Sequence, residues 1–316
     1  MVRWLAIGIG DIARKRVLPA ILAEPRSELY GVVTRDPAKA APYAPARVFT
    51  SLDDALCDAA IDAVYVASPV ALHAPQTIAS LRAGKHVLGE KPAAMNYTEA
   101  QSIALAARAS GKQWGIAYYR RLYPKLIRTR ELIAAGAIGL PVIAEANCHG
   151  WLPAQERSWL WDPAMAGGGP LYDIASHRID ALNFLFGHPA RATGLLSNAV
   201  HKLAVEDSAT IVIDYPEGAR GVVDVRWNSH IERDQFRVIG TDGEIGLDPL
   251  NGPLLRCGGR EENLPPHANL HYPAIENFVS ALAEGRALMC PGEEAIWTDW
   301  VTEQVRKSET ARAPLQ

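Results

Sequence analysis

Cysteine is scarce in this chain of 316 residues, and its four cysteines stand far apart at positions 57, 148, 257 and 290. No two of them form a CxxC pair, which argues against structural zinc, so we expect no metal site. Widely spaced single thiols suit a reducing compartment, and the sequence therefore predicts a cytoplasmic protein.

Long apolar runs are also absent. No stretch reaches the roughly 18 apolar residues that a membrane-spanning helix requires. The apolar start of the chain is short and is followed by Asp11, Arg14 and Lys15, which is not the pattern of a signal peptide. An excess of positive charge is missing as well, because the net charge is −3. We therefore expect neither nucleic acid nor a membrane surface as a partner.

The length suits about two domains, and the first third of the chain alternates between apolar runs and helix-like segments. Apolar runs lie at residues 4–10, 28–34, 61–68, 85–90 and 113–119, and helical patterns at 51–60, 72–83 and 97–110. Such alternation predicts an α/β fold with a doubly wound parallel sheet, the Rossmann arrangement. We place this nucleotide-binding domain at residues 1–120.

The first strand runs into the pattern Gly8-x-Gly10-x-x-Ala13. Gly8 permits a tight turn, Gly10 lets the backbone approach a pyrophosphate, and Ala13 lets the following helix approach the strand. Asp11 and Ile12 open that helix, whose N-terminal N–H groups and partial positive charge favour phosphate. These five residues are predicted to bind a dinucleotide.

The end of the second strand discriminates between the two nicotinamide dinucleotides. Proteins that bind NAD usually place an acid there, whereas those that bind NADP supply an arginine for the 2′-phosphate. Thr34 occupies the position of the acid and Arg35 follows it. This favours NADP, with NAD as the alternative in which Arg35 is only a surface residue and Asp36 contacts the ribose. Asp36 precedes Pro37 and has the character of a turn or helix cap.

Two loops should meet the cofactor at the carboxyl ends of the later strands. One contains Ser68, Pro69 and His73, and the other contains Glu90 and Lys91. A lysine at the mouth of a parallel sheet, followed by a proline that fixes the backbone, indicates a functional role. His73 either caps or contacts the cofactor or only packs at the start of its helix; the sequence leaves both interpretations open.

Beyond residue 120 the pattern changes to that of an α+β domain, which we place at residues 121–316. Candidate strands separated by turn signals predict an open, mostly antiparallel sheet. The alternation in the segment 219–228 implies one buried face and one face available for another purpose, a candidate interface for a homodimer or homotetramer. As an alternative arrangement, the terminal helix packs back on the first domain.

Residues 166–180, AGGGPLYDIASHRID, lead into a helix that should begin near Leu171 and stop at Gly187. At 100° per residue the apolar side chains form one arc, and Asp173 and His177 lie together on the opposite side. Arg178 falls inside the apolar arc without explanation. The pair is either a surface ion pair or part of a site, and the glycines before it favour a site, because they let backbone approach a ligand.

Three motifs together, GIGDIA near the N-terminus, EKP at 90–92 and GGGPLYDIASHRID at 167–180, resemble the glucose–fructose oxidoreductase, inositol dehydrogenase and rhizopine-catabolism (Gfo/Idh/MocA) family. The resemblance implies an NAD(P)-dependent dehydrogenase or reductase that acts on CH–OH groups of sugars, polyols or related cyclic compounds. It also implies that Lys91, Asp173 and His177 form the catalytic group, and that the protein is a dimer or tetramer.

Two departures from the family accompany the resemblance. Many members carry an acid where this chain has Thr34, and many read Trp-Arg before the glycines, where this chain reads WLWDP at 159–163. Trp161 could line the substrate pocket instead, together with Tyr118 and Tyr172, since aromatic faces suit the C–H faces of sugars. Tyr119 and Trp151 are further aromatic candidates, and His149, His201, His230, His267 and His271 are expected in the core or on the surface.

Two alternatives to the sugar or polyol oxidoreductase remain open. One is a non-catalytic NAD(P)-binding regulator, and the other is a reductase of a dihydrodiol- or biliverdin-type compound.

Overall fold

The computed structural model describes residues 1–44, 46–154 and 156–310. The chain forms two compact units, and each is considered separately. Unit 1 consists of Met1–Tyr119 and His267–Ile296, and unit 2 consists of Arg120–Pro266 together with the chain from Trp297 onward. Among the described residues, no helix has the length and apolar character needed to cross a membrane. No group of three or more metal-binding side chains is found within the same part of the chain.

Unit 1 contains a six-stranded sheet in which every neighbouring pair is parallel. In spatial order the strands are β3 (Arg47–Phe49), β2 (Ser27–Val33), β1 (Val2–Ile7), β4 (Ala63–Val66), β5 (His86–Gly89) and β6 (Trp114–Ile116). This confirms the predicted Rossmann sheet. The sequence did not predict β3, because this three-residue edge strand is largely exposed and forms no apolar run.

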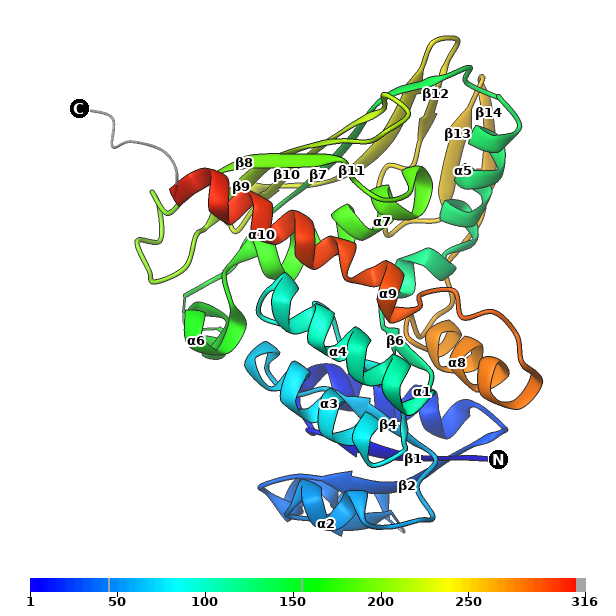
Figure 1. Cartoon of the computed structure of the whole chain (residues 1–316). Helices are drawn as coiled ribbons and strands as arrows, with labels where there is room; N and C mark the ends of the chain where they lie inside the picture. The colour runs from blue at the N-terminus through cyan, green and yellow to red at the C-terminus, as the bar shows by residue number, and fades with distance from the viewer. Residues whose placement is uncertain (45, 155, 311–316) are drawn as a thin grey trace. The chain divides into compact units, whose positions relative to one another are not determined.

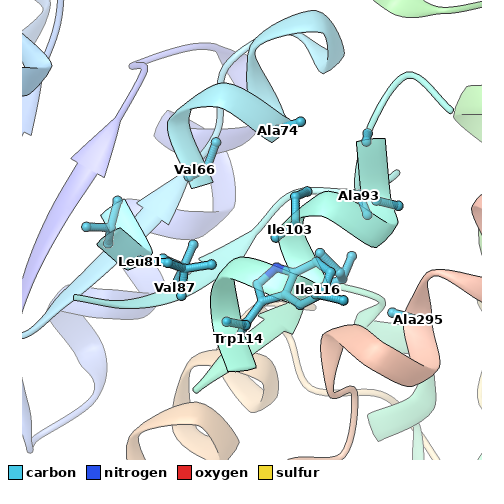
Figure 2. Packing of buried hydrophobic residues seen from close by; sticks show 14 of the residues in the cluster. Val66, Ala74, Leu81, Val87, Ala93, Ile103, Trp114, Ile116 and Ala295 are labelled. Carbon is cyan, nitrogen blue, oxygen red and sulfur yellow. The ribbon is translucent and has the colours of Figure 1, made fainter. Parts of the chain in front are cut away.

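Helices cover both faces of this sheet because successive strand residues point to opposite sides. Figure 2 shows one side, where Leu81 of α3 and Ile103 of α4 pack near Val66 and Val87 of the strands. On the other side α1 and α8 pack against Trp4 and its neighbours. The helical elements of unit 1 are η1 (Ala13–Val17), α1 (Leu18–Ala23), η2 (Pro37–Tyr43), α2 (Leu52–Leu56), η3 (Val70–Leu72), α3 (His73–Arg82), α4 (Tyr97–Ser110), α8 (Tyr272–Glu284) and α9 (Gly292–Ala295).

Unit 2 contains an eight-stranded sheet that is antiparallel except for the pair β7 and β10. In spatial order its strands are β14 (Arg260–Asn263), β13 (Leu254–Cys257), β12 (Glu244–Gly246), β11 (Asn228–Gly240), β7 (Pro141–Trp151), β10 (Arg220–Arg226), β9 (Ser208–Asp214) and β8 (Arg191–Ser197). The predicted open, mostly antiparallel sheet is confirmed. The outer strands β8, β13 and β14 escaped prediction because β8 and β14 expose many side chains and β13, with four residues, is too short to show a clear alternation.

One face of the eight-stranded sheet carries the helices of unit 2, and Figure 1 shows α7 and α10 running along it. In the described part of the chain no helix covers the opposite face, where polar groups interact across the strands. Asp224, for example, accepts hydrogen bonds from His149 Nε2 at 3.1 Å and from Arg226 Nε at 2.8 Å. The helical elements of unit 2 are α5 (Pro124–Ala134), η5 (Ser158–Trp161), α6 (Pro163–Ala166), η6 (Leu171–Ala175), α7 (Ser176–Phe186) and α10 (Trp297–Thr310); η4 (Tyr119–Leu122) joins the two units in the chain.

A buried lysine fixes the loop after β12. Lys125 of α5 is fully buried, and its Nζ donates to the carbonyl oxygens of Leu247 at 3.2 Å and Pro249 at 2.6 Å. Burial lowers the pKa of Lys125 from its ordinary 10.5 to about 8, against the opposing effect of Asp234 and Asp248. The folded protein therefore releases this proton at lower pH than the unfolded chain does.

The stability of the protein should accordingly depend on pH through Lys125. Between the folded pKa of about 8 and the ordinary 10.5, the unfolded chain binds more protons, so the free energy of unfolding rises with pH. Relative to Lys125→Met, the wild type should gain about 1.5 kcal/mol between pH 8 and pH 9.5. Urea unfolding of both proteins at the two pH values measures this difference, and identical pH dependence in the two proteins would contradict it.

Candidate functional site

The turn after β1 has the geometry of a phosphate-binding loop. Gly8 adopts φ +90°, and a Cβ there would lie 3.0 Å from the carbonyl oxygen of Ala67. At Gly10, by contrast, a Cβ would have no protein atom within 4 Å, so open space adjoins the backbone. Ala13 is fully buried beneath this turn. The residues present thus fit a dinucleotide whose pyrophosphate approaches Gly10.

The helix that follows begins at Asp11 and contains the π-helical segment η1 before it continues as α1. The carboxylate of Asp11 accepts from Lys15 Nζ at 2.7 Å and from Arg14 Nη2 at 3.2 Å, and the bond from Lys15 lowers the pKa of this exposed group. Asp11 therefore directs its side chain to its own helix. Together with Ile12 it contributes backbone N–H groups to the helix N-terminus, where phosphates bind.

Three consecutive residues at the end of β2 have different environments. Thr34 is buried, and its Oγ1 accepts from the backbone N–H of Asp36 at 3.1 Å. Asp36 is the N-cap of η2, with its carboxylate accepting from the N–H of Ala38 at 3.1 Å, so the cap interpretation is confirmed. Arg35 is exposed between them. The acid nearest to the ribose position is thus engaged by its own helix.

The loops after β4 and β5 are tied together by His73. Its buried ring lies 2.8 Å from the carbonyl oxygen of Ser68 through Nε2 and 2.8 Å from that of Pro92 through Nδ1. Burial lowers the pKa of His73, and a neutral ring donates to only one of these two carbonyls at a time. Pro69 directly precedes η3, and the Lys91–Pro92 peptide bond is cis. The ring therefore joins the Ser68 turn to the loop that carries Lys91.

Glu90 points into unit 1, where it meets a histidine from a distant part of the chain. Its Oε1 accepts from Tyr65 Oη at 2.8 Å and from His271 Nε2 at 3.0 Å. Burial alone would raise the pKa of Glu90, but the hydrogen bonds from His271 and Tyr65 outweigh it and hold the pKa below its ordinary value. His271 is buried, which is one of the two places expected for it. Its contact with Glu90, 181 residues away in sequence, could not be predicted.

In unit 2, the glycines before η6 are required by internal packing. A Cβ at Gly167 would lie 2.4 Å from the ring of Tyr172, one at Gly168 2.6 Å from the same ring, and one at Gly169 2.0 Å from the carbonyl oxygen of Glu206. Close contact with Tyr172 and Glu206 therefore requires glycine at all three positions, and the expectation that these glycines also open the backbone to a ligand stays a prediction.

Glu206 also caps the helical segment that bears Asp173 and His177. Its Oε1 accepts from the backbone N–H groups of Gly169 at 2.7 Å and Leu171 at 3.1 Å. Burial raises the pKa of Glu206 despite these bonds. A carboxylate at a helix N-terminus interacts favourably with the helix dipole. The residue that holds this segment in place thus comes from the loop between β8 and β9.

The helical wheel drawn from the sequence was wrong in one respect. It placed His177 on a face opposite the buried one, but His177 is 7% exposed and all residues from 176 to 184 are buried. The first turn, η6, is π-helical, so a rotation of 100° per residue does not apply there. Arg178, which the wheel could not explain, is buried and donates from Nη2 to Asp234 Oδ1 at 2.8 Å.

Asp173 retains partial exposure and has an arginine beside it. Arg157 Nη1 lies 3.9 Å from Asp173 Oδ2. Arg157 adopts φ +50°, a left-handed conformation that is uncommon outside glycine. Sequence analysis missed this residue, although it is the only arginine in the segment 152–162. It places a guanidinium near Asp173 even though the Trp-Arg pair of the family is missing.

The three aromatic residues predicted to contact substrate are largely buried. Tyr118 lies in the hydrophobic cluster of unit 1, and Trp161 packs edge-on against Trp227 with ring centroids 5.0 Å apart. Tyr172 lies under the glycines, with its Oη accepting from Arg306 Nη1 at 3.2 Å. Of the remaining histidines, His201 and His230 flank Trp151, and His267 stacks on Tyr272.

Both units match models of a known protein family. The model described as GFO/IDH/MocA C-terminal domain matches residues 126–246, and the model described as oxidoreductase family, NAD-binding Rossmann fold, matches residues 2–118. A 1,5-anhydro-D-fructose reductase of Ensifer adhaerens is 32% identical over 311 residues, which cover 94% of this chain and 93% of that protein. The chain belongs to the Gfo/Idh/MocA family of oxidoreductases.

Further Gfo/Idh/MocA relatives carry different names. A trans-1,2-dihydrobenzene-1,2-diol dehydrogenase of Mus musculus is 27% identical and covers 88% of this chain and 83% of its own. The crystal structure of GenD2 from gentamicin A biosynthesis, in complex with NAD, is 26% identical with a TM-score of 0.86, over 98% of this chain and 94% of that chain. As a member of this family the protein is an NAD(P)-dependent oxidoreductase with an NAD(P)-binding Rossmann unit.

Proposed function

We propose that the protein transfers hydride between NADP and a secondary alcohol or ketone of a sugar, polyol or related cyclic compound. The observation that carries this proposal is its similarity to a 1,5-anhydro-D-fructose reductase over 94% of the chain. The open space beside Gly10 and the family motifs around Lys91 and His177 support it. Reduction of a cyclic keto-sugar is accordingly the first activity to test.

We propose that Lys91, Asp173 and His177 act on the same substrate oxygen and its neighbours. When bound, the nicotinamide ring gives or takes the hydride. His177 removes the hydroxyl proton during oxidation and returns it during reduction, because an imidazole changes charge close to neutral pH. The Lys91 ammonium hydrogen-bonds the reacting oxygen and stabilises its developing negative charge. Asp173, with Arg157 beside it, orients the imidazole or a neighbouring substrate hydroxyl.

The same proposal favours NADP over NAD. Thr34 has no carboxylate to offer the ribose hydroxyls, and the carboxylate of Asp36 caps η2. Arg35 is an exposed cation at this position, available to a 2′-phosphate. NAD remains the alternative cofactor, since a 26% identical structure contains NAD.

Arg35→Ala should therefore weaken NADPH binding by about 10- to 100-fold, the worth of a charge-assisted hydrogen bond, and leave NADH binding within about twofold. Fluorescence titration of both cofactors against the wild type measures this. Arg82→Ala removes an exposed arginine at the C-terminus of α3 and serves as the matched control. Equal losses for the two cofactors would show that Arg35 does not read the 2′-phosphate.

A substrate panel distinguishes the proposed function from its alternatives. Oxidation of NADPH and NADH is followed with keto-sugars, cyclic ketones and a biliverdin-type tetrapyrrole, and reduction of NADP and NAD with polyols and trans-dihydrodiols. The dihydrodiol arm is included because a 27% identical relative is a dihydrodiol dehydrogenase. Turnover of sugars supports the proposal. Turnover of dihydrodiols alone favours the second candidate, and cofactor binding without any turnover favours a regulator.

We also propose that the predicted domain 121–316, apart from residues 267–296 that belong to unit 1, provides substrate binding and self-association. The uncovered face of the eight-stranded sheet is then the contact between copies in a homodimer or homotetramer. The absence of a covering helix on this face, in the part of the chain described above, supports the proposal. Val222→Arg places a charge on that face, at a half-buried position beside Asp224. Analytical ultracentrifugation should then show smaller particles than for the wild type; an unchanged mass would count against this face.

A further inference from the structure

A buried polar cluster lies directly behind the loop that carries Lys91. It consists of Glu90, Tyr65 and His271, which are buried, and Tyr119, which is half-buried, and we call it the Glu90 cluster. Glu90 accepts from Tyr65 and His271 at 2.8 and 3.0 Å, and the ring of His271 packs on that of Tyr119 with centroids 4.7 Å apart. Every one of these residues belongs to unit 1. The cluster therefore converges on the residue that precedes Lys91 in the chain.

The donors of the cluster follow from chemistry. An ionised carboxylate only accepts, so Tyr65 Oη and His271 Nε2 both donate to Glu90. The other ring nitrogen, His271 Nδ1, is buried and has no hydrogen-bond partner among the described residues, so the contact with Glu90 is the polar interaction that sets the ring. The backbone N–H of His271 donates to Asn269 Oδ1 at 3.1 Å, and Asn269 Nδ2 donates to the carbonyl oxygen of Arg16 at 2.8 Å. His271 is thereby anchored to the helix that follows the phosphate-binding turn.

We infer that Glu90 and His271 are positioning residues that hold Lys91 in its working place, an inference that rests on the proposed role of Lys91. A buried carboxylate is costly unless it is fully hydrogen-bonded, so Glu90 stays in place only while both donors are present. Loss of one donor forces Glu90 to move toward another partner or toward water, and Lys91 moves with it because the two residues share a peptide bond. A displacement of about 1 Å at a catalytic group is enough to lower turnover by about 100-fold.

The central test compares two substitutions of His271. His271→Leu removes the donor, and His271→Gln can place its amide nitrogen near the position of Nε2 and restore it. We expect His271→Leu to lower kcat by about 10- to 100-fold with the KM for NADPH within about twofold, and His271→Gln to recover most of the loss. A residue that only supports the fold would instead lower the amount of active enzyme, with no rescue by glutamine.

A milder pair of variants covers the case in which His271→Leu does not fold. Tyr65→Phe deletes a single hydroxyl that donates to Glu90, whereas Tyr30→Phe deletes one that donates to Asp58 at 3.0 Å elsewhere in the same sheet. We expect Tyr65→Phe to lower kcat by about fivefold, because a buried hydrogen bond to a charged group contributes more free energy than a partly exposed one. We expect Tyr30→Phe to leave kcat unchanged. Wild-type kcat in Tyr65→Phe and in folded His271→Leu would overturn the inference, as would His271→Gln no more active than His271→Leu.

The same assay separates this inference from the proposed function. If Lys91→Met retains full turnover, the proposed role of Lys91 is wrong, and the inference about its positioning is wrong with it. If Lys91→Met is inactive while the variants of Tyr65 and His271 are fully active, the proposed function stands and only the positioning role is overturned.

Discussion

Lys91→Met should lower kcat by about 100- to 10,000-fold, the range expected for loss of a group that handles charge at the reacting oxygen. The substitution keeps the apolar stem of the side chain and removes the ammonium. Because the dinucleotide is held mainly by the turn after β1, the dissociation constant of NADPH should stay within about twofold of the wild-type value. Steady-state kinetics gives kcat, and fluorescence titration gives the dissociation constant.

Lys112→Met is the matched control for this experiment, since Lys112 is a half-buried lysine in the same unit. It should leave both quantities unchanged. If Lys91→Met binds NADPH normally and turns over at the wild-type rate, Lys91 has no part in the chemistry. If it loses NADPH binding instead, Lys91 serves the cofactor and not the substrate.

His177→Asn should lower kcat by a similar factor, about 100- to 10,000-fold, because the proton of the substrate hydroxyl would have no acceptor. We expect the loss to be largest at pH values near neutrality, where an imidazole exchanges protons most effectively. Measuring kcat/KM for alcohol oxidation from pH 5.5 to 9 tests this. The wild type should lose activity toward acid pH as the base becomes protonated, and the variant should show no such decline.

His188→Asn supplies the comparison for His177, since His188 belongs to the same unit and its ring stacks on Trp297. It should retain the wild-type pH profile. An acid decline that persists unchanged in His177→Asn would assign the base to another residue. Circular dichroism should accompany the measurement, because His177 is buried in α7 and its loss also removes packing.

Local signals were sufficient to predict the fold where side chains alternate or form apolar runs. The strands around Trp4 and Tyr65 are buried on both faces, and their apolar runs predict a parallel sheet with helices on each side. The edge strand β3 and the outer strands β8 and β14 expose many of their side chains to solvent, and β13 has only four residues, so the sequence does not distinguish them from loops. Hydrogen bonding to a neighbouring strand makes them strands.

Some residues of the site could also be predicted from the sequence, and others could not. Gly8 could be predicted because its backbone conformation demands glycine, and Gly10 because the dinucleotide motif keeps the space beside it open. His271 and Glu206 could not be predicted, since each acts on a residue far away in sequence, Glu90 and Gly169 respectively. The π-helical first turn before α7 has no clear sequence signal either, and the helical wheel failed at His177 because residues 176–184 are buried on every side of the helix.

The central claim is that Lys91 and His177 serve one and the same reaction step, and a double-mutant cycle tests it most directly. The rate of hydride transfer is measured in a single turnover for the wild type, Lys91→Met, His177→Asn and the double variant. If the two groups act on one substrate oxygen, the double variant should be about as slow as the slower single variant. A double variant whose rate loss equals the product of the two single losses would contradict the account.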